Sequence, residues 1–128
     1  MCGISGIFDW NSLKNAEHIA SIMKDAQDHR GPDFNSTYKD ENILISHNRL
    51  SIIDLDHHSN QPMHSNLGDV VISYNGELYN YLNLKSELEA TYSFKTQSDT
   101  EVIIASYLKW GIRTVSYTHL RAHETEAD

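Results

Sequence analysis

The spacing of hydrophobic residues changes along the chain, and each spacing predicts a type of secondary structure. Apolar residues that alternate with polar ones, or form short apolar runs, predict strands over residues 4–8, 43–53 and 70–74. Apolar residues that recur every three or four positions predict amphipathic helices over residues 16–28, 81–92 and 98–110. The polar segment 54–66, which contains Pro62, predicts a loop. The expected order is therefore strand, helix, strands, helix, helix.

Proline, glycine and capping residues mark the expected ends of these elements. Residues 30–33 (Arg-Gly-Pro-Asp) should stop the first helix, because the residue before a proline is pushed out of the helical region. Asn75-Gly76 is a strong turn signal after the third strand. Ser98, with Glu101 three residues later, resembles a capping box that opens the last helix, and Gly111 should end it.

Composition narrows the class of protein. The 128 residues suffice for one domain, and a net charge of -8 argues against nucleic acid, because phosphate binding needs clustered Lys and Arg. No apolar run reaches the length of a membrane span, and the N-terminus does not resemble a signal peptide. The single Cys cannot form an internal disulfide. We therefore expect a cytoplasmic protein with no nucleic-acid partner and no membrane partner.

The position of that single cysteine has a chemical consequence. Cys2 is small enough for Met1 to be removed cleanly, which leaves a free α-amino group on the residue that carries the thiol. An α-amine titrates at about 7.7 to 8, so it can accept the thiol proton directly or through one water. Cys2 would then supply both nucleophile and base. The alternative is a small buried hydrophobic residue near the end of a strand.

Two other features carry both a functional and a structural interpretation. The Asn75 side-chain amide and the Gly76 N–H could form an oxyanion hole, or the pair could be a simple hairpin turn. Arg49 lies inside an apolar stretch, where its planar guanidinium could bind a ligand carboxylate in bidentate fashion. A structural ion pair, or an edge-strand Arg that points to water, would explain the same residue.

The histidines do not predict a metal site. His57, His58 and His64 lie in a polar segment without the spacing of a helical pair, and no second Cys supports them. His29 and His47 are expected to be structural residues that form hydrogen bonds. We therefore expect no metal in this chain.

Six motifs in order resemble one family. They are MCGISG at 1–6, HRGPD at 29–33, RLSIID at 49–54, QP at 61–62, NGELYN at 75–80 and SDTEV at 98–102. Together they resemble the class II glutamine amidotransferase domains, which are N-terminal-nucleophile hydrolases. The second and third motifs resemble the glutamine-dependent asparagine synthetases more than other members. The resemblance covers residues 1–112.

This resemblance implies an α+β fold, an αββα sandwich of two antiparallel sheets that is incomplete here. It also implies the catalytic roles. Cys2 would attack the side-chain amide of L-glutamine and form a glutamyl thioester, which is then hydrolysed to glutamate and ammonia. Asn75 and the Gly76 N–H would stabilise the oxyanion.

The resemblance further implies a pocket for a free amino acid. Arg49 would hold the substrate α-carboxylate, and Glu77 and Asp99 would hold its α-ammonium. Asn75 and Gly76 would also contact the substrate. Backbone groups of four consecutive residues would line the pocket: Leu50, Ser51, Ile52 and Ile53.

The family pattern also sets the expected extent of the domain. Residues 113–128 do not resemble the family and look like translated sequencing-adapter read-through, so we expect them to be an artefactual tail. Relatives continue into a synthetase domain that uses ATP and Mg, and no phosphate-binding glycine-rich loop occurs here. We expect no cofactor in this chain. An inactive truncated module, or a glutaminase that serves another amide acceptor, are the alternatives.

Overall fold

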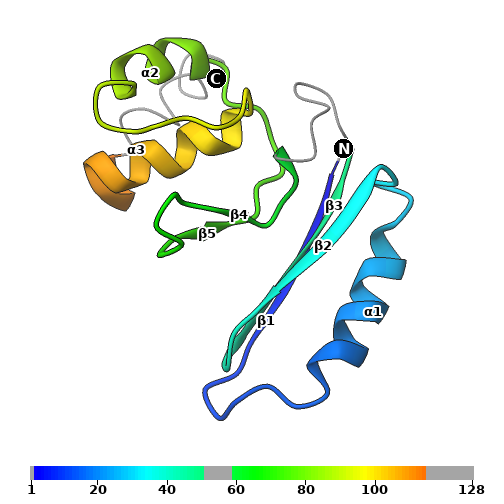
Figure 1. Cartoon of the computed structure of the whole chain (residues 1–128). Helices are drawn as coiled ribbons and strands as arrows, with labels where there is room; N and C mark the ends of the chain where they lie inside the picture. The colour runs from blue at the N-terminus through cyan, green and yellow to red at the C-terminus, as the bar shows by residue number, and fades with distance from the viewer. Residues whose placement is uncertain (1, 51–58, 115–128) are drawn as a thin grey trace.

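The computed structural model describes residues 2–50 and 59–114, which form three helices and two small antiparallel sheets in an α+β arrangement (Figure 1). The elements in chain order are β1 (Gly3–Phe8), α1 (Ala16–Gln27), β2 (Phe34–Lys39), β3 (Ile43–Arg49), β4 (Met63–His64), β5 (Val71–Ile72), α2 (Tyr81–Leu88) and α3 (Asp99–Thr114). None of the helices described is long and apolar enough to cross a membrane.

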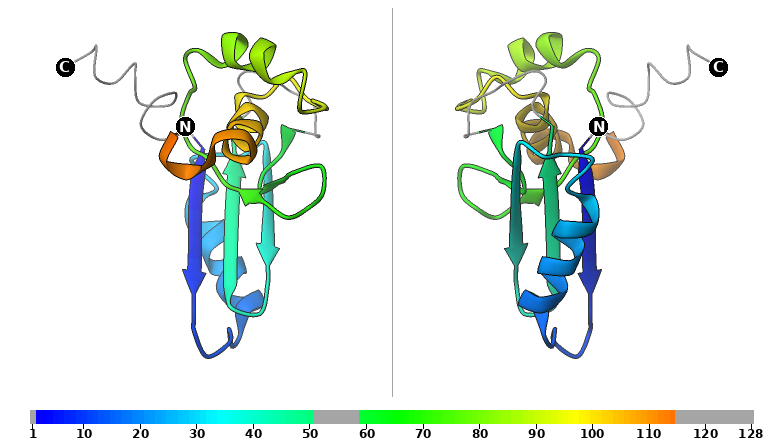
Figure 2. Two further views of the ribbon diagram at one scale, coloured as in Figure 1. Left: turned by 90° about the vertical axis from the view of Figure 1, so that its left-hand side faces the viewer. Right: turned by 90° about the vertical axis from the view of Figure 1, so that its right-hand side faces the viewer.

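The first sheet has the order β1-β3-β2, so β3 is its central strand and pairs antiparallel with both neighbours. Gly3 lies opposite Asn48 on one side, and Phe34 lies opposite Arg49 on the other. Figure 2 shows the three strands side by side, with α1 across one face. The Asn48 side-chain amide donates to the Lys24 carbonyl of α1 at 3.1 Å, which fixes that helix on the central strand.

Gly31 explains how the chain returns from α1 to the sheet. A Cβ atom at this position would lie 2.1 Å from the Asn48 carbonyl oxygen, so only glycine allows the backbone to pass this close to β3. The Asp33 N–H then donates to the Arg49 carbonyl at 3.0 Å, and β2 begins at the next residue.

Residues 59–114 form the second part of the molecule, which contains a hydrophobic core between α2 and α3. Its buried residues are Leu78, Leu84, Leu88, Val102, Ile103 and Ala105. The two-stranded sheet of β4 and β5 lies between this core and the first sheet (Figure 1). Tyr92 and Phe94 pack against the core from the segment that joins the two helices.

The three predictions for the ends of α3 have different outcomes. Ser98 is the N-cap, because its Oγ accepts the Thr100 N–H at 3.2 Å. Glu101 does not close a capping box, because its carboxylate accepts the N–H groups of Lys95 and Thr96 instead. Gly111 interrupts the helix with φ 77° and ψ 172°, as expected for a helix-ending glycine.

Several expected strands and element boundaries were wrong. β2 was not predicted, because its residues FNSTYK are mostly polar and the strand is defined by its place beside β3. β4 falls within the expected loop 54–66. The strand expected over 70–74 is restricted to Val71–Ile72, because only those residues pair with β4. The helix expected over 81–92 ends at Leu88.

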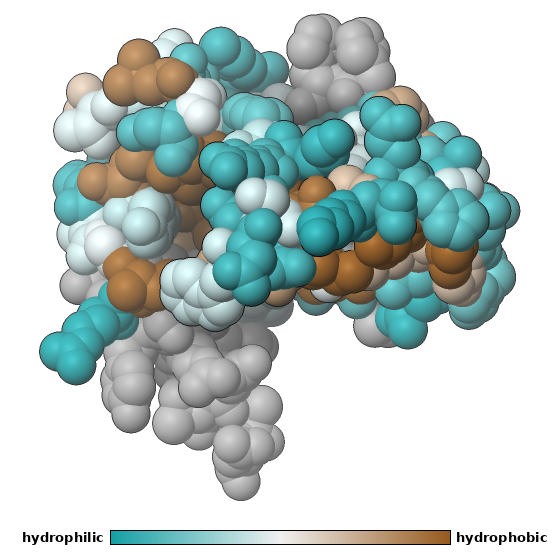
Figure 3. Space-filling model, turned by 90° about the horizontal axis from the view of Figure 1, so that it is seen from below, coloured by the Kyte–Doolittle hydropathy of each residue, from teal (hydrophilic) through white to brown (hydrophobic). Residues whose placement is uncertain are grey.

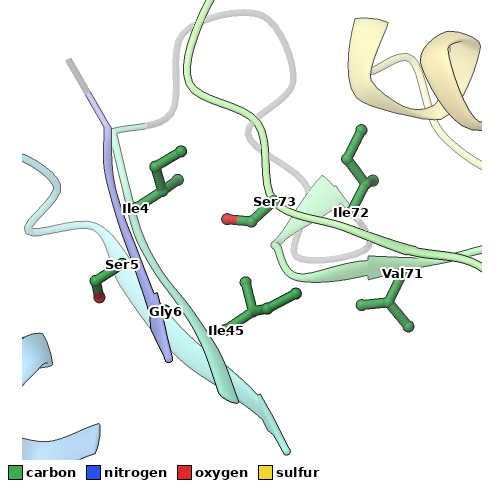
Figure 4. A pocket seen from close by; sticks show the side chains of 7 residues that line it. All are labelled: Ile4, Ser5, Gly6, Ile45, Val71, Ile72 and Ser73. Carbon is green, nitrogen blue, oxygen red and sulfur yellow. The ribbon is translucent and has the colours of Figure 1, made fainter. Parts of the chain in front are cut away.

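An apolar hollow of about 510 Å³ lies between the first sheet and the sheet formed by β4 and β5. Ile4 and Ile45 point into it from the first sheet, and Val71 and Ile72 line its other side (Figure 4). The view from below shows hydrophobic side chains at the surface of the molecule (Figure 3). Ile4, which lines the hollow, is 44% exposed, so this face of the sheet is only partly covered.

Candidate functional site

Cys2 lies at the start of β1, beside the end of the central strand. Its Sγ is 3.2 Å from the Leu50 nitrogen and 3.5 Å from the Leu50 carbonyl oxygen. The thiol is half-buried. The sulfur thus lies near both a backbone donor and a backbone acceptor of Leu50. The antiparallel register, which places Gly3 opposite Asn48, therefore brings the only cysteine of the chain to a backbone donor.

Arg49 is the last residue of β3 and is only 6% exposed. Its Nη1 donates to the Asn60 side-chain oxygen at 2.5 Å. An Arg that points to water from an edge strand, one of the alternatives from the sequence, is therefore wrong. The guanidinium is instead held inside the protein, on the strand end that also carries Leu50 beside Cys2.

Asp99 and Glu77 provide negative charge at a second point. Asp99 is buried, and its Oδ2 accepts the Leu78 N–H at 2.8 Å. Burial raises the pKa of Asp99, while the N–H groups of Leu78 and Thr100 lower it and the charge of Glu77 raises it further. The negative charge of Glu77 is thus felt at Asp99.

Asn75 and Gly76 do not form a hairpin turn. The residues after Gly76 lead to α2 and to no paired strand, so the hairpin alternative is wrong. Asn75 is half-buried and Gly76 is exposed. The Tyr74 carbonyl, one residue earlier, is 3.2 Å from the His47 Nε2, which places this segment beside the end of β3.

Those predicted site residues that the structure describes thus lie at three separate positions in the fold. Cys2 contacts Leu50, Asn75 follows a residue that is tied to β3, and Asp99 interacts with Glu77. Three of the four predicted backbone residues, Ser51, Ile52 and Ile53, lie outside the described residues. The roles assigned to all of these residues stay predictions.

Sequence reasoning missed the residues that connect these places. Gln61 and Asn60 hold Tyr74 and Arg49, but the sequence offered only an unassigned Gln-Pro pair as a signal. His47 forms a hydrogen bond to backbone, as the sequence predicted. Gln61 and Asn60 could not be identified from the sequence, because no residue spacing shows which groups an amide side chain will bind.

A metal site has no ligand set in the described part of the chain, where no group of three His, Cys, Asp or Glu residues gathers. His64 is exposed and packs edge-on against Tyr38, with ring centroids 5.5 Å apart. His57 and His58 lie outside the described residues.

Comparison with known proteins identifies the class of domain that has this fold and site. A family model described as "Glutamine amidotransferase domain" matches residues 1–120. The chain therefore belongs to the glutamine amidotransferase domain family, and the family predicted from its motifs is confirmed.

Individual relatives include asparagine synthetases and one protein named as an amidase. Asparagine synthetase [glutamine-hydrolyzing] 1 of Bacillus subtilis is 40% identical over 111 residues, which cover 84% of this chain and 17% of the relative. Asparagine synthetase B [glutamine-hydrolyzing] of Escherichia coli is 37% identical over 87% of the chain and 20% of its own length. Amidase chry2 of Gibberella zeae is 35% identical over 94% of the chain and 20% of its own length. The chain spans about a fifth of the length of these curated relatives.

Proposed function

We propose that this chain is a glutaminase unit that releases ammonia from L-glutamine, with Cys2 as nucleophile. The observation that carries the proposal is the position of the Cys2 thiol, which lies against the Leu50 N–H at the end of the central strand. Removal of Met1 frees the Cys2 α-amine, which takes the thiol proton. The thiolate then forms a C–S bond to the side-chain amide carbon of glutamine.

The remaining steps need an oxyanion hole and a proton donor. The carbonyl oxygen of the substrate becomes an oxyanion, which the Asn75 amide and the Gly76 N–H stabilise. The C–N bond breaks, the nitrogen leaves as ammonia after it receives the proton held by the Cys2 amine, and a thioester remains. Water hydrolyses this thioester to glutamate and restores the thiol.

The charges of the site match the two charged ends of a free amino acid. Arg49 binds the α-carboxylate, for which its planar guanidinium is suited. Asp99 and Glu77, whose negative charges interact, bind the α-ammonium. The backbone of Leu50, which contacts the Cys2 thiol, lines the pocket between these ends.

In the whole protein, the ammonia serves an amide-forming reaction outside this chain, for which we propose aspartate as acceptor. Several relatives are named asparagine synthetases, which supports this choice. The relative named as an amidase leaves another acceptor as the second candidate. The fold we propose for the complete domain is an αββα sandwich in a cytoplasmic enzyme. ATP and Mg act outside this chain, which needs no cofactor of its own.

Glutamate release from L-glutamine tests the proposal. We expect Cys2→Ala to reduce glutamate release to the uncatalysed background. We expect the same loss when one lysine is inserted between Met1 and Cys2, because the thiol is then retained without a free α-amine on its own residue. Mass spectrometry of the parent chain checks that Met1 is absent. Full activity in the insertion variant would show that the α-amine is not the base.

A further inference from the structure

The peptide groups on both sides of Tyr74 are held by buried side chains. The Tyr74 N–H donates to the Gln61 Oε1 at 2.5 Å, and the Tyr74 carbonyl is 3.2 Å from the His47 Nε2. Gln61 is 7% exposed and His47 is 0% exposed. Solvent therefore does not compete for either hydrogen bond.

The two side chains reach Tyr74 from different elements. His47 lies on β3, two residues before Arg49. Gln61 precedes β4, and its Nε2 donates to the Thr100 Oγ1 at 3.1 Å in the first turn of α3. Gln61 thus connects Tyr74 to the helix end that carries Asp99.

The charge state of His47 suits a donor role. Burial lowers the pKa of His47, the Tyr74 carbonyl raises it, and the charge of Arg49 lowers it further. A neutral imidazole has one N–H, and a carbonyl partner requires that proton on Nε2. The Nδ1 atom has no hydrogen-bond partner among the described residues.

These contacts determine where the backbone goes next. The N–H of Tyr74 belongs to the peptide plane before its Cα, and its carbonyl belongs to the plane after it. When both planes are held, φ and ψ of Tyr74 are fixed, and so is the direction in which Asn75 leaves. The Tyr74 carbonyl also shares its plane with the Asn75 N–H.

We propose that Gln61 and His47 are positioning residues, which hold Tyr74 so that Asn75 and Gly76 meet the oxyanion in the transition state. This inference rests on the proposed glutaminase function. The clamp formed by Gln61 and His47 binds Tyr74 and Thr100, and it includes none of the residues proposed to bind glutamine or to attack it. Its loss should therefore slow the chemical step and leave substrate affinity nearly unchanged.

Gln61→Met tests the clamp, because methionine is similar in volume and makes neither hydrogen bond. We expect kcat to fall about 10- to 100-fold, since displacement of oxyanion donors by about 1 Å has effects of this size. The KM for glutamine should change by no more than about twofold. Gln97→Met, at an exposed position, is the matched control and should retain the parent kcat.

His47 provides an independent pair of variants. His47→Gln keeps an N–H donor at a similar distance from the backbone and should retain most of kcat. His47→Ala removes the donor and should lower kcat as Gln61→Met does. Equal kcat values for His47→Gln and His47→Ala would overturn the proposal. So would loss of the cooperative unfolding transition in Gln61→Met and His47→Ala alike, because both residues would then be required for the fold.

Hydrogen exchange at the Tyr74 amide separates this inference from the function on which it rests. Faster exchange in Gln61→Met, together with reduced kcat, supports the clamp. A parent chain that hydrolyses glutamine, with unaffected kcat in Gln61→Met, overturns the clamp alone. A folded parent chain without glutamine hydrolysis overturns the glutaminase proposal, and the catalytic role of the clamp with it.

Discussion

Asp99 combines a structural and a proposed binding role in one carboxyl group. It accepts the Leu78 N–H and lies near the charge of Glu77. Its pKa is raised, so the native state holds the proton more tightly than the unfolded chain does. The ionised form therefore costs stability at neutral pH, and the chain regains that stability as the pH falls through the folded pKa.

Asp99→Asn should separate these roles. The Asn side-chain oxygen still accepts the Leu78 N–H, and no charge is buried, so the free energy of unfolding at pH 7 should be unchanged or higher. The KM for glutamine should rise about tenfold or more, because a charged hydrogen bond to the ammonium is lost. Urea unfolding and steady-state kinetics measure the two quantities.

Glu77→Gln provides the comparison for Asp99→Asn. Glu77 is exposed, so its loss should raise KM by less than the loss of Asp99 does. A destabilised Asp99→Asn chain with the parent KM would contradict the assigned role in binding.

At the scale of elements, hydrogen bonds to Glu101 connect the start of α3 to the segment before the helix. The Glu101 carboxylate accepts the N–H of Lys95 at 2.8 Å, and both the N–H and the hydroxyl of Thr96, at 2.7 and 2.6 Å. Glu101 is only 3% exposed. The start of α3 thus depends on a side chain that reaches back beyond the helix itself.

Glu101→Ala should destabilise the chain by about 2–4 kcal/mol, because buried backbone donors lose a charged acceptor. Glu89→Ala, at an exposed position after α2, should change stability by no more than about 0.5 kcal/mol. Chemical denaturation of both variants measures the difference. Equal stability of the two variants would show that solvent replaces the carboxylate.

The elements that could be predicted are those with their own periodicity. β1 and α1 were predicted to within one residue at each end, because their apolar residues repeat at the strand and helix periods. β2 was not, because a polar edge strand is defined by its neighbour β3. The partners of Glu101 were also not predicted. The spacing of Ser98 and Glu101 fits a capping box, but it fits equally well a glutamate that accepts the N–H groups of Lys95 and Thr96.

At the scale of the molecule, polar contacts connect the first sheet to the second part. His47 contacts Tyr74, Arg49 contacts Asn60, and Tyr38 packs against His64. The family motifs identified the candidate residues of the site, since each motif carries a residue of a recognised type. They could not reveal Gln61 as a connector, because that role depends on where β3 and α3 lie.

The pH dependence of stability should depend on His47 in particular. Its pKa is lowered in the folded chain, so the unfolded chain binds protons more tightly. The stability that neutral His47 contributes is therefore complete above about pH 6.5 and is lost as the pH falls from there through the folded pKa.

His47→Gln should flatten this decline, because glutamine does not titrate. Unfolding free energies from about pH 7.5 to 5.5 would measure the slope in both chains. His64→Gln, at an exposed position, is the matched control for the substitution itself. A parent slope in His47→Gln would assign the decline to other groups.

The apolar hollow between the sheets also affects how stability varies with temperature. Ile4, Ile45, Val71 and Ile72 line a volume of about 510 Å³, and Ile4 is 44% exposed. Apolar surface that water already reaches in the native state adds nothing to the heat-capacity increment of unfolding. That increment should therefore be smaller than for a closed domain of the same length. A smaller increment flattens the stability curve, so folding in this chain responds less to cooling than its length alone would imply.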